Sequence, residues 1–142
     1  MMKTMGRQAK MASRSLARLD AKQKNLLLRD LGENLIKRKE EILEANQEDL
    51  AMGVENGLSE ALMDRLMLNE ERILSMKEGL YTVEKLENPV GEIFEMKTLD
   101  DGLKVGKMRV PLGVVGIIYE SRPNVTIDTA ALCIKSGNAL IL

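Results

Sequence analysis

The sequence predicts an α/β protein built from three consecutive parts: an N-terminal helical layer, a β-hairpin and one βαβ unit that begins a parallel sheet. Three observations support this prediction. Apolar residues follow a helical period up to Pro89, polar and apolar residues then alternate, and a continuous apolar run starts at Gly113. The corresponding segments are residues 1–88, 89–110 and 111–142.

Helical spacing dominates the first 88 residues. Leu27, Leu31 and Leu35 recur every four residues with Leu28 beside them, which is typical of the buried face of a helix. Asp20 precedes this stretch as a suitable N-cap, and Asn69 is placed to cap a later helix. The inward-facing residues expected in that later helix are Ile73, Met76, Leu80 and Val83.

The first 19 residues carry five basic side chains and no acidic one. Such a segment resembles an amphipathic transit peptide. The alternative is the polar face of an ordinary surface helix, with Met11, Leu16 and Leu19 turned inward. We favour the surface helix.

Two alternating stretches, residues 92–97 and 103–110, flank the turn sequence Asp100-Asp101-Gly102. This pattern predicts a β-hairpin with one face toward a core and one toward water. The edges of a hairpin can pair with another subunit, so residues 89–110 are a candidate oligomerisation element.

The last 30 residues have the pattern of a βαβ unit. Residues 114–118 are almost continuously apolar, which is typical of a strand buried on both faces. Residues 128–135 have helical spacing, Ser136-Gly137-Asn138 provides a stop, and residues 139–142 begin a second strand. Short connections around a helix indicate that the two strands run parallel.

A polar loop, Tyr119-Glu120-Ser121-Arg122-Pro123-Asn124, follows the first of these strands. Ligands of open α/β sheets bind beyond the carboxyl ends of the strands, which is where this loop lies. Arg122, held extended by the proline after it, either binds a phosphate or carboxylate or is an ordinary surface arginine. Asn124 either caps the helix or directs its amide at a ligand.

Composition excludes several kinds of site. The chain of 142 residues contains one cysteine and no histidine, so Cys/His zinc sites and Ser-His or Cys-His catalytic pairs are ruled out within it, and no metal is expected. Cys133 lies between Leu132 and Ile134, which favours a small buried hydrophobe over a nucleophile. A net charge of -1 gives no reason to expect a nucleic-acid partner, and no stretch is apolar enough to predict a membrane span.

The segment Arg109–Leu142, and within it Tyr-Glu-Ser-Arg-Pro-Asn-Val-Thr, closely resembles the start of the cofactor domain of the γ-glutamyl phosphate reductases. These enzymes, also called glutamate-5-semialdehyde dehydrogenases, belong to the aldehyde dehydrogenase superfamily. Asn56–Leu66 and Leu43–Leu50 are also similar to that family. The likeness starts near Met5-Gly6 and includes the basic first helix, which argues against a transit peptide.

The resemblance implies a cytoplasmic enzyme of proline biosynthesis. It would use NADPH to reduce L-glutamyl 5-phosphate to L-glutamate 5-semialdehyde, with release of phosphate. Residues 111–142 would then start an aldehyde-dehydrogenase-like, Rossmann-type NADP(H)-binding sheet, truncated here, and the complete protein would be a homo-oligomer with a small-molecule substrate. The choice between NADPH and NADH stays open.

The resemblance also assigns candidate site residues. Asn124 would be the oxyanion-hole amide, although the loop is about two residues longer than in many superfamily members. The family's nucleophilic cysteine belongs to a later domain and Cys133 is not at its position, so we expect an N-terminal fragment that is inactive alone. The residues expected to face the cofactor are Tyr119, Glu120, Ser121, Arg122 and Pro123.

Two alternatives remain at this level. The chain is either part of another acyl-reducing relative or a non-catalytic interaction module. In every case a two-strand sheet cannot be covered on both faces, so marginal stability is expected. The residues expected to stay partly wet are Val114, Val115, Ile117, Ile118, Leu140 and Ile141.

Overall fold

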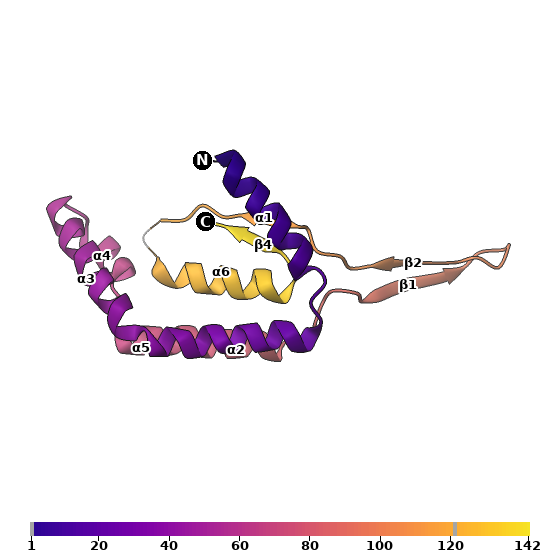
Figure 1. The fold of residues 1–142 in the computed structure, drawn as a ribbon, viewed down its shortest axis with the longest axis horizontal. Coiled ribbons are helices and arrows are strands. Elements are labelled where there is room, and N and C mark those ends of the chain that lie inside the picture. The colour runs from indigo at the N-terminus through magenta and orange to yellow at the C-terminus, as the bar shows by residue number, and fades with distance from the viewer. Residues whose placement is uncertain (1, 121) are drawn as a thin grey trace.

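A computed structural model describes residues 2–120 and 122–142. The elements of this part of the chain, in order, are α1 (Met2–Leu16), α2 (Ala21–Lys37), α3 (Lys39–Glu55), α4 (Glu60–Leu66), α5 (Glu70–Lys85), β1 (Ile93–Thr98), β2 (Lys104–Met108), β3 (Val114–Gly116), α6 (Pro123–Lys135) and β4 (Ala139–Ile141). Helices α2 and α5 lie side by side, α6 lies above them in the view of Figure 1 and runs along them, and the hairpin β1–β2 projects away from the body. The order of parts agrees with the predicted α/β architecture.

The core lies where α2, α5 and α6 meet. Its buried side chains are Leu28, Leu35, Ile73, Met76, Leu80 and Ala131. Both expected helix caps are present: Asp20 accepts a hydrogen bond from the Gln23 amide in a capping box, and Asn69 accepts one from the Arg72 amide.

The buried face of α2 contains most of the predicted residues. Leu28 and Leu35 are buried and Leu31 packs against the core, whereas Leu27 is exposed, contrary to the prediction. Lys24, one turn before Leu28, is also fully buried, and the row that faces α5 contains Gly32, where an added Cβ would lie 3.3 Å from Cγ of Lys77. The pattern did not predict these two positions because it counts a lysine and a glycine as outward.

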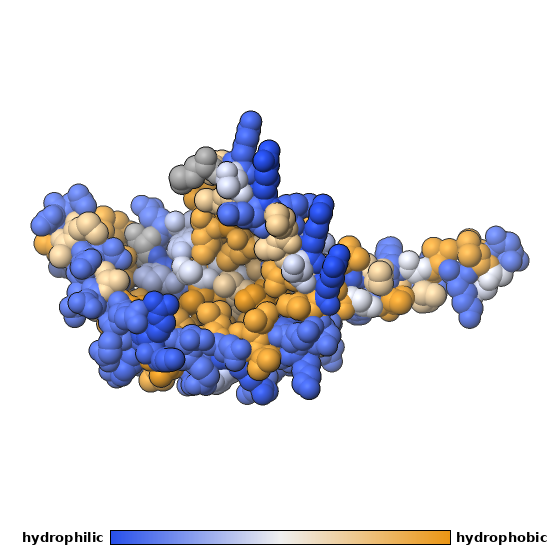
Figure 2. Space-filling view, in the orientation of Figure 1, coloured by the Kyte–Doolittle hydropathy of each residue, from blue (hydrophilic) through white to orange (hydrophobic). Residues whose placement is uncertain are grey.

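The βαβ unit forms as predicted, with β3 parallel to β4 and Val114 opposite Ala139. Strand β3 is shorter than the predicted 114–118 and is not buried on both faces, since its two valines are half-buried and Gly116 is exposed; Ile118, beyond its end, is fully exposed. The apolar residues named above as partly wet are half-buried or exposed. Helix α1 packs on this small sheet, and Figure 2 shows apolar surface gathered around it.

Helix α6 begins at Pro123, five residues before the predicted start at Asp128. Proline is well suited to the first turn of a helix, because its missing N–H would have no partner there. The C-terminal stop is confirmed. Gly137 has φ of 74°, the Asn138 amide donates to Cys133 O at 2.8 Å, and the Gly137 amide donates to Ile134 O at 3.1 Å, which is a Schellman motif.

The hairpin is confirmed in its strands and differs in its burial. Its strands are antiparallel, with a register shift between Phe94 and Lys97, where Glu95 has φ of 52°. Gly102 supplies the turn with φ of 84°. Both faces are solvent-exposed in this chain apart from half-buried Phe94, so the predicted core-facing side has nothing of this chain to cover it.

Helix α1 is the surface helix predicted for the basic segment. Its buried residues are Ala9 and Ser13, while Met11 is exposed, contrary to the prediction. Within the described residues, no helix combines the length and the apolar character that crossing a membrane requires.

Candidate site at the start of α6

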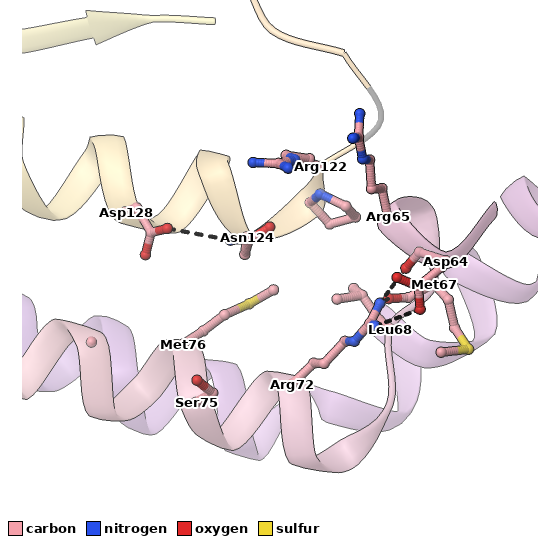
Figure 3. A pocket seen from close by; sticks show the side chains of 12 residues that line it. Asp64, Arg65, Met67, Leu68, Arg72, Ser75, Met76, Arg122, Asn124 and Asp128 are labelled. Carbon is pink, nitrogen blue, oxygen red and sulfur yellow. Dashed lines mark hydrogen bonds and ion pairs between the residues drawn. The ribbon is translucent and has the colours of Figure 1, made fainter. Parts of the chain in front are cut away.

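A cavity of about 460 Å³ lies between the first turns of α6 and the α4–α5 connection (Figure 3). Two parts of the chain far apart in sequence meet there, α4–α5 and the start of α6, and both acidic and basic side chains line the cavity. The residues that surround it are Asp64, Arg65, Met67, Leu68, Arg72, Ser75, Met76, Gly79, Arg122, Pro123, Asn124 and Asp128.

Arg72 holds one wall of the cavity in place. Its guanidinium donates to the Asp64 carboxylate at 2.8 Å, to Met67 O at 2.7 Å and also to Asp64 O. The charges of Arg72 and Asp64 are therefore paired with each other (Figure 3). This arrangement fixes the connection between α4 and α5.

Arg65 and Arg122 supply the unpaired positive charge. Arg65 extends from α4 toward the start of α6, and Arg122 is the residue immediately before that helix (Figure 3). Both side chains are exposed, and neither forms an ion pair within the part of the chain that the structure describes. Guanidinium groups bind phosphate and carboxylate in a bidentate manner, so this end of the cavity favours an anion.

Arg122 has the extended backbone predicted for a residue before proline, with φ of -138° and ψ of 88°. It occupies the N-cap position without a side-chain cap hydrogen bond. Asn124 lies inside the first turn, so it does not cap the helix, which was one of the two roles that the sequence allowed. Its Nδ2 donates to Oδ2 of Asp128 one turn later, over a long 3.4 Å.

Helix α5 faces Asn124 and Asp128 across the cavity with small residues. Ser75 and Gly79 are four residues apart, as Asn124 and Asp128 are on α6. A Cβ added at Gly79 would lie 3.7 Å from Oδ1 of Asp128, an ordinary contact distance, so Gly79 lies directly opposite that carboxylate. Met76, which is buried, forms the floor (Figure 3).

The structure brings three of the six loop residues to the cavity: Arg122, Pro123 and Asn124. Tyr119 does not line it, since its hydroxyl is hydrogen-bonded to that of Thr126 on α6. Glu120 is exposed outside the cavity, and Ser121 lies outside the described residues.

Sequence reasoning missed Arg65, Ser75 and Asp128 as cavity residues. For Asp128 a signal existed, the four-residue spacing from Asn124 that places both side chains on one helix face. For Arg65 and Ser75 there was none, because only the packing of α4 and α5 against α6 brings them near the loop.

Cys133 lies two turns further along α6 and is buried, as predicted. Burial raises the pKa of its thiol, which disfavours the thiolate that a nucleophile requires. Within residues 2–120 and 122–142, no group of three or more Cys, Asp or Glu side chains is arranged to hold a metal ion.

Known proteins were compared with this chain by sequence and by structure. No family model matches it. The chain is 54% identical over 136 residues to the γ-glutamyl phosphate reductase of Halothermothrix orenii, and 54% identical over 138 residues to that of Carboxydothermus hydrogenoformans. These matches cover 96% and 97% of this chain but 32% and 33% of the relatives, so the chain spans about a third of their length.

Solved structures give the same result. The crystal structure of γ-glutamyl phosphate reductase from Thermotoga maritima superimposes with a TM-score of 0.91 at 42% identity, over 94% of this chain and 32% of that one. The structure of the enzyme from Saccharomyces cerevisiae gives a TM-score of 0.92 at 36% identity, over 98% of this chain and 35% of that one. In sequence and in fold, the chain therefore corresponds to the N-terminal third of the γ-glutamyl phosphate reductases.

Proposed function

We propose that this chain forms the N-terminal part of a cytoplasmic, NADPH-dependent γ-glutamyl phosphate reductase. The reaction reduces L-glutamyl 5-phosphate to L-glutamate 5-semialdehyde and releases phosphate, as a step of proline biosynthesis. The observation that supports it most strongly is the identity to named reductases, which extends over nearly the whole chain.

The donors at the start of α6 fit a phosphate-bearing cofactor. The Arg122 guanidinium, which has no ion pair among the described residues, lies where α6 begins, and no side chain caps the first turn of that helix. We propose that Tyr119, Glu120, Arg122 and Pro123, with Ser121 beside them, form the cofactor-facing loop. NADP(H), when bound, supplies the hydride; the residues of this chain position it and contribute positive charge.

Asn124 suits the role of an oxyanion-hole amide. Its Nδ2 faces the cavity, and its only hydrogen bond among the described residues is the long one to Asp128. An acyl oxygen can displace that bond and gain a shorter one as negative charge develops on it. Because Cys133 is buried with a raised thiol pKa, the nucleophilic thiolate has to come from polypeptide outside this chain.

The hairpin fits the proposed role in a homo-oligomer. It projects from the body, and both of its edges are unpaired in this chain (Figure 1). Apolar side chains lie exposed along it, as Figure 2 also shows: Ile93, Met96, Leu103, Val105 and Met108. The same feature supports the second candidate, a non-catalytic module that binds a complete reductase subunit.

A chimera tests the enzymatic proposal. Residues 1–142 replace the matching segment of the Carboxydothermus hydrogenoformans reductase, and the fusion is assayed with glutamate 5-semialdehyde, phosphate and NADP⁺. We expect NADPH formation that depends on phosphate. A chimera that circular dichroism shows to be folded and that has no such turnover would contradict the proposal. Activity of residues 1–142 alone would contradict the statement that the nucleophilic thiolate lies outside this chain.

A further inference from the structure

The charges that line the cavity are arranged along α6 in a definite order. After Arg72 and Asp64 are paired with each other, the free charges are the guanidinium groups of Arg65 and Arg122 and the carboxylate of Asp128. The cations lie at the start of α6, and Asp128 lies one turn further in, beyond Asn124 (Figure 3). The cavity is therefore positive at one end and negative at the other.

The proposed substrate has the same order of groups. Its acyl phosphate is anionic, the acyl carbon follows, and an α-ammonium group is borne by the carbon three bonds further on. With Asn124 at the acyl oxygen, the acyl phosphate lies toward Arg65, Arg122 remains for the cofactor, and the ammonium group lies toward Asp128.

The spacing agrees with this order. Three carbon–carbon bonds span about 4 Å, and side chains at i and i+4 of a helix have Cβ atoms about 5–6 Å apart. A hydrogen bond at each end accommodates the difference. Asp128 and Gly79 line the cavity opposite each other, and Gly79 has no side chain to occupy the space in front of the carboxylate.

From this geometry we infer that Asp128 binds the α-ammonium group of the substrate and thereby selects an amino acid over an unsubstituted acyl phosphate. The inference rests on the proposed function for the identity of the substrate. It assigns the carboxylate a specificity role and leaves the chemical step to Asn124 and to groups outside this chain.

Binding to the chain itself is the first test. The stable probe L-2-amino-6-phosphonohexanoate has the same chain length as the substrate. The second probe, 6-phosphonohexanoate, differs from it only in lacking the amino group. Isothermal titration compares the two. We expect the amino compound to bind about fivefold more tightly, as for an exposed ion pair, and this ratio to fall to about one in Asp128→Asn.

The matched control is Asp30→Asn, an exposed aspartate of α2 that does not line the cavity. It should preserve the ratio between the two probes. Equal affinities of the two probes for the wild type would overturn the inference. So would an affinity ratio that Asp128→Asn leaves unchanged.

Kinetics of the chimera provide the second test. Asp128→Asn should raise KM for glutamate 5-semialdehyde and leave KM for 5-oxopentanoate, which has no amino group, unchanged. If the chimera is active and both KM values respond alike, the inference fails and the proposed function stands. If the chimera is inactive while the probe ratio behaves as expected, the proposed function fails and the ammonium site stands.

Discussion

At the scale of single residues, Lys24 is a buried positive charge inside the helical layer. It has no exposed surface, and its Nζ donates to Oδ1 of Asn88 at 3.2 Å. Lys135 lies nearby, donating to Asn25 Oδ1 at 2.8 Å and to Glu84 O at 2.7 Å. Burial lowers the pKa of Lys24, and repulsion from Lys135 lowers it further. The bond to Asn88 ties α2 to the segment that leads into the hairpin.

Replacing this lysine should stabilise the protein at neutral pH. Lys24→Met retains the aliphatic volume and removes the cost of burying a charge, so we expect a gain of about 1 kcal/mol in the free energy of unfolding. Because the pKa is lower in the folded state, the cost is fully present below that pKa and is relieved as pH rises toward 10.5, the ordinary value.

The measurement is urea unfolding at neutral and at alkaline pH. The advantage of Lys24→Met over the wild type should shrink on the alkaline side, while Lys22→Met, at an exposed position, should show no such trend. A loss of stability at neutral pH in Lys24→Met would show that the Asn88 bond outweighs the burial cost.

At the scale of elements, Asn46 fixes the α3–α4 arm against the start of α5. It is buried, its Nδ2 donates to Leu66 O at 2.9 Å, and its Oδ1 accepts from the Leu68 amide at 2.7 Å. Both backbone groups belong to the connection that forms a wall of the cavity. Its position therefore links the outer arm to the site.

Removing this side chain should be costly. Asn46→Ala leaves two backbone groups without partners, so we expect a loss of about 1–3 kcal/mol in the free energy of unfolding. Asn34→Ala is the control, because Asn34 bonds only within its own exposed helix face. Urea unfolding of both variants measures the difference, and equal stabilities would refute the assigned role.

The hairpin should contribute to association and little to the stability of the body. The Gly91 amide donates to Arg109 O at 2.9 Å, so the two ends of the hairpin are adjacent, and Asn-Gly can replace residues 93–108. We expect the thermal midpoint to stay within about 2 °C of the wild type, as for other exposed sites. In the chimera, the same replacement should lower the mass in solution measured by light scattering. An unchanged mass would show that the hairpin does not contribute to the interface between subunits.

At the scale of the whole molecule, local chemistry made the order of elements predictable. Asp20, Asn69 and Gly137 fix helix ends through hydrogen bonds or backbone angles that depend on near neighbours. The parallel pairing of β3 with β4 also followed from a short crossover, and the resemblance predicted a site in the loop that leads into α6.

Features that depend on distant packing were not predictable. Burial of Lys24 depends on acceptors from other elements, and the cavity exists because α4 and α5 approach the start of α6. The exposure of β3 and of the hairpin arises because a strand pattern specifies a buried face without specifying which polypeptide covers it. Ile118 is the extreme example, apolar by sequence and fully exposed here.

The central claim is that the first turn of α6 contacts the reacting acyl group. In the chimera, Asn124→Ala measures this most directly, with Asn34→Ala as the control and thermal melts to verify folding. Because the proposed oxyanion donor is lost, we predict that kcat falls by about 10²–10³-fold and that the melting midpoint is unchanged. A folded Asn124→Ala chimera with the kcat of its parent would contradict the claim.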